Sequence, residues 1–219
     1  MNMLDLEALA RTPLTREPFD FMVVPNFIRP EAAVALKQDF PAIPYPGLLP
    51  VEATRPGPSF SALVETLQSS ELATAFSQKF GLDLLDRPMM ITVRGQCDAR
   101  DGRIHTDSET KVVTCLLYFN ESWEESGGRL RLLRSPTDLN DVIAEVPPDF
   151  GTLIAFRRSD NSYHGHEPYV GPRRYVMFNW MASGFAARSE LLRHEVSAVA
   201  KRLFPITAAA LAKQGGGYA

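Results

Sequence analysis

A histidine and an aspartate occur in this sequence at a spacing suited to binding a metal ion. His105 and Asp107 are two residues apart, and on an extended backbone residues i and i+2 point the same way. An imidazole and a carboxylate could therefore reach one ion together. A second histidine from a distant strand would complete a set of two histidines and one carboxylate, which is typical of mononuclear non-haem Fe(II) sites with open coordination positions. The His-x-Asp pair alone is weak evidence, because an exposed hydrogen-bonded turn has the same pattern.

Two histidines compete to be the third metal ligand. His164 and His166 both follow a predicted strand and both precede the pair Arg173 and Arg174. We favour His164, because it leaves a full strand end and a turn between the metal and the arginines. His166 would then lie near the metal, face the substrate or lie on the surface, and the surface position is the preferred interpretation.

An arginine at the start of a late strand could bind a carboxylate. Arg174 is expected to share a strand face with Val176, Phe178 and Trp180, because alternate residues of a strand point to the same side. These residues would line an apolar pocket with one guanidinium at its end, where bidentate pairing with a carboxylate is strong. Arg173 belongs to the preceding turn and is assigned to the surface.

The C-terminal half of the chain reads as a series of short strands separated by turn residues, which predicts a β-sandwich or jelly roll. The expected strands are Met89–Arg94, Lys111–Phe119, Gly128–Leu133, Asp141–Val146, Gly151–Phe156 and Arg174–Met181. We expect this core to span about residues 88–182.

The N-terminal part, residues 1–87, is expected to support that core. The predicted elements are a short helix within residues 1–17, a strand near Phe19–Phe27, a helix from Pro30 to Phe40, and helical segments over Phe60–Phe80 with a break at Ser69 and Ser70. Residues 41–58 contain six prolines and form a long loop that either borders a binding site or is a stiffened surface excursion.

The last predicted element is an amphipathic helix over residues 186–204. Its apolar side is expected to carry Leu191, Leu192, Val196, Val199 and Leu203. A flexible tail over residues 213–219 should follow it. All of these elements are expected to form one domain over residues 1–219, with neither an internal repeat nor a second domain.

Several motifs in order resemble the Fe(II)- and 2-oxoglutarate-dependent dioxygenases, and within them the prolyl 4-hydroxylase group. The resemblance covers roughly Met89 to Met181, with an N-terminal extension back to Phe19. The motifs are His105-x-Asp107, the run Thr114 to Asn120 followed by Trp123, Gly127-Gly128-x-Leu130, Pro148-x-x-Gly151-x-Leu153-x-x-Phe156, and His164-x-x-x-Pro168 leading to Arg174-Tyr175 and Trp180. Their combined order and spacing is far more specific than any one of them.

The resemblance implies a double-stranded β-helix, which is a distorted jelly roll, with N-terminal helices packed on one sheet and a C-terminal helix. It implies that His105, Asp107 and His164 bind iron. It further implies that Arg174 and Tyr118 hold the distal carboxylate of 2-oxoglutarate and that Trp180 lines the same pocket. Without the resemblance, Tyr118 would be interpreted as a core aromatic residue on a strand.

The implied reaction is hydroxylation of an unactivated C–H bond, coupled to conversion of 2-oxoglutarate to succinate and carbon dioxide. Its cofactors would be Fe(II), 2-oxoglutarate and dioxygen, with ascorbate as a candidate reductant. A tyrosine of the collagen-type and oxygen-sensing relatives, on the strand before the first histidine, has no counterpart, and Arg94 or Gln96 lies near its place. This departure leaves open whether the substrate is a prolyl residue, a free amino acid or another small molecule. Asp107 argues against the halogenases, in which a small residue replaces it.

Composition excludes several other classes. The formal net charge of −3 and the absence of a basic stripe argue against nucleic-acid binding, and no apolar run is long enough to span a membrane. Met1–Ala10 lacks the pattern of a secretion signal, and Cys97 and Cys115 are too few for a disulfide framework. We therefore expect a reduced, cytoplasmic protein that acts on a small molecule or peptide, while the sequence leaves its oligomeric state open.

Two other functions compete with the oxygenase. One is a non-catalytic, cupin-like jelly-roll module that binds a metal, and the other is a zinc hydrolase that uses the same ligands. Neither function explains why the chain has an arginine that could hold a co-substrate. The hydrolase also lacks a nearby acidic base in a motif. Iron-specific activity that a chelator reverses would separate the oxygenase from both.

Overall fold

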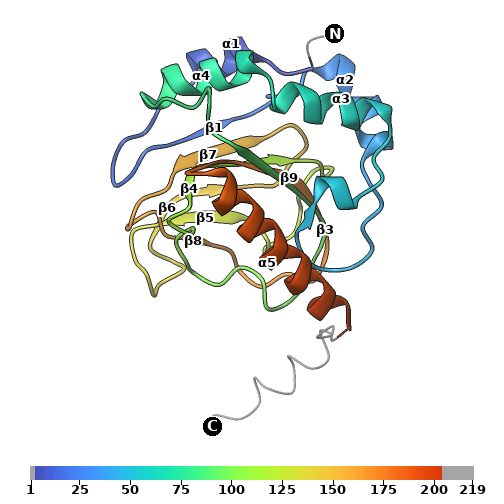
Figure 1. The fold of residues 1–219 in the computed structure, drawn as a ribbon. Coiled ribbons are helices and arrows are strands. Elements are labelled where there is room, and N and C mark those ends of the chain that lie inside the picture. Colours follow the sequence, from blue (N-terminus) through green and yellow to red (C-terminus); the bar gives the residue numbers. More distant parts are fainter. Residues whose placement is uncertain (1–2, 204–219) are drawn as a thin grey trace.

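The computed structural model describes residues 3–203, with the side chains of the last helix described as far as Arg193. Two antiparallel sheets face one another (Figure 1). The larger sheet has the strand order β1-β7-β4-β9-β3-β2, and the smaller has the order β6-β5-β8. The predicted double-stranded β-helix with flanking helices is confirmed. The tail expected at residues 213–219 lies outside the described residues.

The strands follow the predicted positions closely but include two short ones that the sequence did not indicate, β2 and β8. Their bounds are β1 Phe21–Val24, β2 Leu49–Pro50, β3 Met89–Cys97, β4 Lys111–Tyr118, β5 Leu130–Leu133, β6 Val142–Val146, β7 Leu153–Arg157, β8 His164–Gly165 and β9 Gly171–Met181. The start of β9 at Gly171, three residues before the predicted start, matters for the site described below.

Four N-terminal helices and a 3-10 turn precede the β-rich part. They are α1 Leu6–Arg11, α2 Pro30–Asp39, the 3-10 turn Val51–Ala53, α3 Pro58–Leu67 and α4 Ser70–Phe80. The predicted break between α3 and α4 is confirmed, because Ser69 caps α4 by accepting a hydrogen bond from the Leu72 amide at 3.2 Å. Gly81 ends α4 in the left-handed conformation, with φ of 67°.

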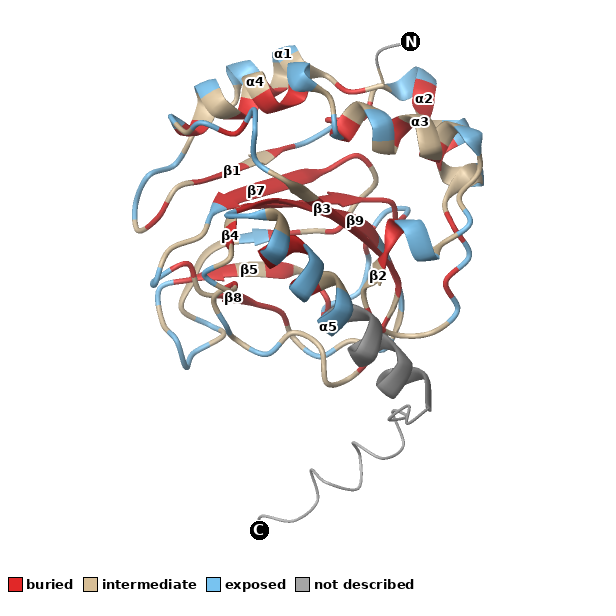
Figure 2. Ribbon diagram, viewed as in Figure 1, coloured by how far each residue is buried: buried red, intermediate tan, exposed pale blue. Residues whose placement is uncertain are grey.

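The N-terminal helices cover one face of the larger sheet, and an apolar core lies between these helices and the sheet (Figures 1 and 2). Phe76 of α4 packs on Trp180 and Phe178 of β9, with ring centroids 4.8 and 6.1 Å away. Phe60 of α3 reaches Phe119 at 5.5 Å. Burial of these aromatic surfaces is the main force holding the helical layer on the sheet.

The opposite face of the larger sheet turns toward the smaller sheet and forms a second apolar cluster with it. On β4 the residues with even numbers, Leu116 and Tyr118, belong to this cluster, whereas Cys115 and Leu117 belong to the helix-covered core. The alternation follows from the two-residue period of a strand. The connection from β3 to β4 and the short strand β8 close this side of the fold and carry the candidate metal ligands.

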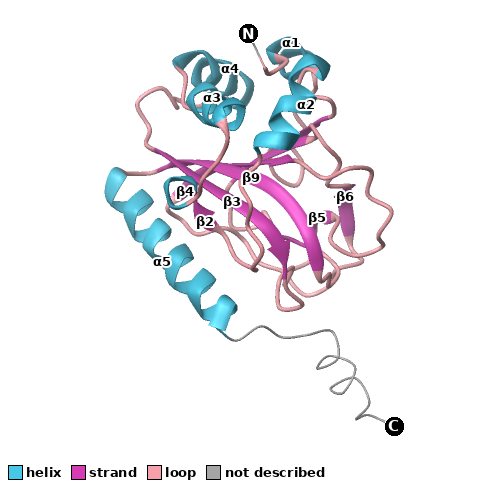
Figure 3. Cartoon of the chain, turned by 90° about the vertical axis from the view of Figure 1, so that its right-hand side faces the viewer, coloured by secondary structure: helices cyan, strands magenta, loops and turns pink. Residues whose placement is uncertain are grey.

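The last helix, α5 Gly184–Leu203, runs beside the edge of the larger sheet (Figure 3). Ala186 and Ala187 are buried against Met90 and Met181. Leu192 is 62% exposed, so the prediction that it shares the buried side of this helix is wrong. The other predicted apolar residues from position 196 onward lie outside the described side chains. Within residues 3–203, none of the helices has the length and hydropathy needed to cross a membrane.

Candidate metal centre

The structure brings together the three side chains that the sequence suggested as metal ligands. One possible ligand atom from each of His105, Asp107 and His164 lies within 4.8 Å of the other two. The two histidines are neighbours because their backbones pair: the His105 amide donates to the His164 carbonyl at 3.1 Å, and the His164 amide donates to the His105 carbonyl at 2.9 Å. A bridge between two distant segments therefore assembles the set.

Both imidazoles are oriented by backbone carbonyl groups. The Nδ1 of His105 lies 2.8 Å from the Arg103 carbonyl, and the Nδ1 of His164 lies 3.0 Å from the Ser162 carbonyl. Because a carbonyl can only accept, each Nδ1 carries the proton and each Nε2 keeps a free lone pair for a metal. Burial lowers the pKa of His164 to about 4, with the nearby His105 adding to the effect. Its imidazole is therefore neutral at neutral pH, as metal binding requires.

The carboxylate of Asp107 is held from both sides. Lys111 donates to Oδ1 at 2.8 Å and Thr114 donates to Oδ2 at 2.5 Å. Burial alone would raise the pKa of Asp107, but Lys111, His164 and the Thr114 hydrogen bond outweigh it and hold the pKa well below its usual range. The group is thus a fixed anion, and the donor set of two imidazoles and one carboxylate fits a ferrous ion.

Asn179 supports Asp107 indirectly, through a hydrogen bond with Thr114. The amide of Asn179 lies 3.0 Å from the Thr114 hydroxyl oxygen. That hydroxyl has one proton, and the Asp107 carboxylate accepts it, so Asn179 must present its NH2 group to Thr114. This orientation also gives a partner to the buried Asn179 amide nitrogen, which otherwise lacks one. The chain Asn179–Thr114–Asp107 ties the metal loop to strands β4 and β9.

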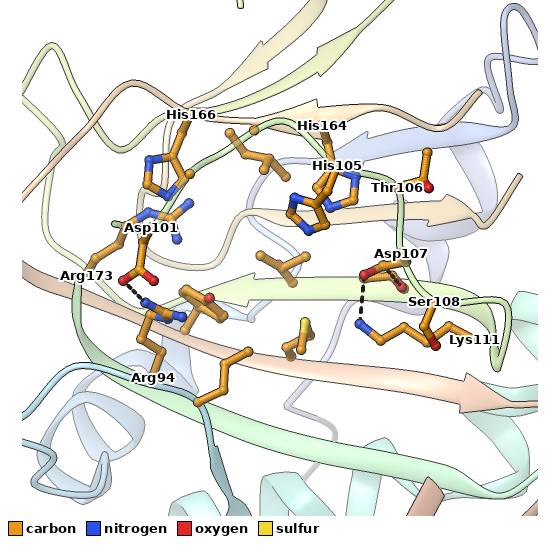
Figure 4. Close-up of a pocket in the computed structure, with 18 of the residues that line it drawn as sticks. Arg94, Asp101, His105, Thr106, Asp107, Ser108, Lys111, His164, His166 and Arg173 are labelled. Carbon is orange, nitrogen blue, oxygen red and sulfur yellow. Dashed lines mark hydrogen bonds and ion pairs between the residues drawn. The ribbon is translucent and has the colours of Figure 1, made fainter. Parts of the chain in front are cut away.

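The metal residues open on a cavity of about 580 Å³ between the two sheets (Figure 4). His105 and His164 lie side by side along one wall, and Asp107 lies next to Lys111 (Figure 4). Arg94, Asp101, His166 and Arg173 are gathered at one end, and Ser108 and Lys111 lie at the other (Figure 4). Four apolar side chains from both sheets also line it, namely Leu116, Leu130, Tyr175 and Met177.

Arg173, rather than Arg174, faces this cavity. Arg173 is 2% exposed and donates from Nε to the Gly128 carbonyl at 2.7 Å and from Nη2 to the Tyr118 hydroxyl at 3.4 Å. Arg174 is exposed on the other side of β9, beside a groove that also contains Lys37. The prediction that Arg174 points into the pocket is wrong by one residue, because β9 begins before the predicted turn ends.

The same shift of register moves Trp180 out of the site. Trp180 is 1% exposed and packs on Phe76 under the helices, so the prediction that it lines the pocket is also wrong. Tyr118 is fully buried and contacts Arg173 through its hydroxyl and its ring. Burial raises the pKa of Tyr118 to about 12, so this hydroxyl remains a hydrogen-bond donor throughout the neutral range.

His166 is a buried wall of the cavity, contrary to the surface position preferred from the sequence. It is 6% exposed, its Nδ1 donates to the Glu167 carbonyl at 2.8 Å, and its Nε2 lies 3.9 Å from the Cys97 sulfur. Gly102 packs against it so closely that a Cβ there would lie 2.4 Å from the His166 carbonyl oxygen. His166 thereby fixes the loop that leads to the first metal ligand.

The comparisons with known proteins agree with this geometry. Residues 95–182 match the family model described as the 2OG-Fe(II) oxygenase superfamily, and this segment contains the triad together with Arg173 and Tyr118. The chain is similar to this superfamily over that segment, which is 88 of its 219 residues. The predicted resemblance is therefore confirmed. No curated protein matches the sequence significantly.

Solved structures of prolyl 4-hydroxylases share the fold. A Pseudomonas putida prolyl-4-hydroxylase has 18% sequence identity and a TM-score of 0.52, with 80% of this chain and 92% of that chain covered. A prolyl 4-hydroxylase from Phytophthora capsici has 20% identity and a TM-score of 0.51, with 98% of this chain and 71% of that chain covered. At such low identities the likeness is one of fold.

The roles of several residues around the site were not predicted from the sequence. Lys111 was interpreted only as a strand residue, although a lysine four positions after a candidate ligand can reach it, and Thr114 only as a strand residue that begins one of the family-like motifs. Arg94 was noted only for standing where relatives have a tyrosine, and it forms a buried ion pair with Asp101 at the cavity wall. The predicted loop over residues 41–58 contributes Leu48 to the cavity lining, and residues 94–103 contribute Arg94, Asp101 and Gly102.

Proposed function

We propose that this chain is an Fe(II)- and 2-oxoglutarate-dependent dioxygenase that hydroxylates an unactivated C–H bond. In the balanced reaction, one atom of dioxygen enters the substrate as a hydroxyl group and the other enters succinate, while 2-oxoglutarate loses carbon dioxide. The observation that carries the proposal is the shared cavity: a triad of two histidines and one carboxylate opens on the same space as the buried guanidinium of Arg173, which donates hydrogen bonds to the Gly128 carbonyl and the Tyr118 hydroxyl.

In this proposal His105, Asp107 and His164 hold the iron, which supplies the activation of dioxygen. The protonated Nδ1 atoms fix both imidazoles, and Lys111 and Thr114 fix the carboxylate. Ligands fixed in this way would hold an iron ion beside the cavity without rearrangement. Two histidines and one carboxylate on one side of the metal favour iron over the closed tetrahedral ligand sets of structural zinc sites.

Arg173 would hold the distal carboxylate of 2-oxoglutarate. Its Nε and Nη2 are used by Gly128 and Tyr118, and its Nη1 has no hydrogen-bond partner among the described residues. A carboxylate could accept from that Nη1 and from the Tyr118 hydroxyl together. The surrounding rings of Tyr118 and Tyr175, at 5.6 and 5.1 Å from the guanidinium carbon, keep water away and strengthen the pairing.

The substrate would enter beside the metal and present the C–H bond to it. The apolar residues of the cavity lining exclude water from the reacting groups. The structural relatives are prolyl 4-hydroxylases, so a prolyl residue is one candidate substrate, and a small molecule that fits a cavity of about 580 Å³ is the other.

One experiment tests the proposal directly. Protein prepared without oxygen would be mixed with Fe(II) and 2-oxoglutarate and monitored for the visible charge-transfer band between iron and the 2-oxo acid. Air and ascorbate would then be added and succinate measured in the same sample. We expect a band that a chelator removes, followed by slow succinate formation without substrate. A folded protein that binds iron but gives neither signal would support the non-catalytic metal-binding module instead.

A further inference from the structure

Lys111 is a buried cation with more hydrogen-bond donors than partners among the described side chains. It is 5% exposed and lines the cavity at the end away from Arg173 (Figure 4). An ammonium group has three N–H donors, and the only hydrogen bond of Lys111 to another described side chain is the one to Asp107 at 2.8 Å. The next carboxylate, that of Glu190, already accepts hydrogen bonds from Arg193 at 3.0 Å and from Thr110 at 3.4 Å.

In the loaded site the nearby carboxylate left for Lys111 among the described residues is that of Glu190, which already pairs with Arg193. Asp107 and the metal-binding carboxylate of 2-oxoglutarate would together balance the two positive charges of Fe(II). The distal carboxylate would balance Arg173, and Asp101 balances Arg94. Since Asp107 is then shared with the metal, one positive charge remains, and it belongs to Lys111. An unbalanced charge in a buried position is costly.

We propose that the substrate of this enzyme carries a carboxylate that pairs with Lys111. The inference rests on the oxygenase function proposed above and narrows its substrate class to acids. Thr106 also lines the cavity and adds a hydroxyl donor for a carboxylate, whereas Ser108 and Arg193 of the same lining already bind Thr110 and Glu190. The oxidised C–H bond would then lie between that carboxylate and the metal.

The test uses acetate as a minimal carboxylate and acetamide as its neutral analogue of the same shape. The full-length protein would be loaded with Mn(II) in place of iron and with N-oxalylglycine in place of 2-oxoglutarate. Relaxation of the methyl protons of acetate by the paramagnetic Mn(II) then reports binding beside the metal without any turnover. We expect saturable relaxation of acetate and at least tenfold weaker binding of acetamide.

Variants of Lys111 separate its charge from its support of Asp107. Lys111→Gln keeps a donor for Asp107 but removes the charge, and Lys111→Arg keeps the charge. At Mn(II) concentrations that saturate each variant, we expect Lys111→Gln to weaken acetate binding at least tenfold and Lys111→Arg to recover most of it. Lys37→Gln removes a half-buried lysine outside the cavity and should behave like the wild type.

The outcomes also identify the source of the carboxylate. If Lys111 instead binds 2-oxoglutarate, Lys111→Gln will raise the dissociation constant of 2-oxoglutarate by tenfold or more and leave acetate relaxation unchanged, which overturns the proposal. Equal relaxation of acetate and acetamide, or none of acetate, overturns it as well. Failure of the proposed function is distinct, because Fe(II)-loaded wild-type protein would then show no charge-transfer band with 2-oxoglutarate.

Discussion

The two faces of the six-stranded sheet carry very different side chains. The face under the helices is filled by apolar residues such as Val176, Phe178 and Trp180, which are at most 1% exposed. The face toward the smaller sheet carries Arg173 and Asn179 among its apolar residues. Both faces are built from the same strands by alternation, so one residue of register decides whether a side chain stabilises the fold or serves the site.

This contrast predicts two classes of variant. Changes on the helix-covered face should lower the free energy of unfolding and spare the affinity for ligands, because its packed side chains are remote from the cavity. Changes on the cavity face should do the reverse, because polar groups beside a cavity contribute little to packing. The variants below test this division from the largest expected effect to the smallest.

Asp107→Ala should abolish iron-dependent turnover. The substitution removes the only carboxylate of the triad and leaves Lys111 buried without its partner. We expect succinate formation to fall by about 10³-fold or more and iron binding to be lost under conditions that saturate the wild type. Asp86→Ala, on an exposed turn, is the matched control. Near-normal turnover in Asp107→Ala would remove Asp107 from the ligand set.

Trp180→Ala should be the most destabilising change on the helix-covered face. Trp180 is 1% exposed and packs 4.8 Å from the ring of Phe76. Loss of a buried aromatic side chain costs about 3–5 kcal/mol, which urea denaturation can measure. The dissociation constant of 2-oxoglutarate should change less than twofold at temperatures where the variant is folded. Leu192→Ala, at a side chain that is 62% exposed, should shift stability by less than about 0.5 kcal/mol.

Arg173→Ala and Arg174→Ala form a matched pair on adjacent residues. Arg173→Ala should raise the dissociation constant of 2-oxoglutarate about 100-fold, because it removes a buried guanidinium from the proposed carboxylate site. Arg174→Ala should leave it unchanged, since that side chain is exposed on the other side of β9. Isothermal titration with Mn(II)-loaded protein measures both. The reverse result would mean that the register of β9 in solution differs by one residue.

Much of this architecture follows from local sequence signals. The His-x-Asp spacing, the strand periodicity and the break at Ser69 each depend on neighbouring residues, and the structure bears them out. The register of β9 does not, because both of its phases contain an arginine and aromatic residues. A usable signal was present nevertheless: after Arg174 at its start, one phase continues with the apolar residues Val176, Phe178 and Trp180 and therefore belongs to the core, whereas the other phase contains Asn179 in the same stretch.

Contacts between segments that are distant in the sequence could not be predicted from the sequence either. Thr114 supports Asp107 and contacts Asn179 only because β4 pairs with β9, and His166 is buried only because the β3–β4 connection folds over it. Neither contact can be predicted from the pattern of apolar and polar residues nearby in the sequence. Strand β8, which is two residues long, is likewise too short to produce any periodicity.

Tyr118→Phe should have the smallest effect and tests whether Tyr118 serves the cavity face through its hydroxyl. Removing one hydrogen bond to a charged group should raise the dissociation constant of 2-oxoglutarate about fivefold to tenfold, while the ring still packs on Tyr175. Burial raises the pKa of Tyr118 to about 12, so the neutral donor form persists above pH 10, where an ordinary tyrosine would ionise. The dissociation constant of 2-oxoglutarate for Tyr118→Phe, divided by that for the wild type, should therefore stay constant from pH 8 to pH 10.5. A ratio that falls toward one as the pH passes 10 would mean that the hydroxyl ionises normally, and a ratio of one at every pH would make Tyr118 a packing residue alone.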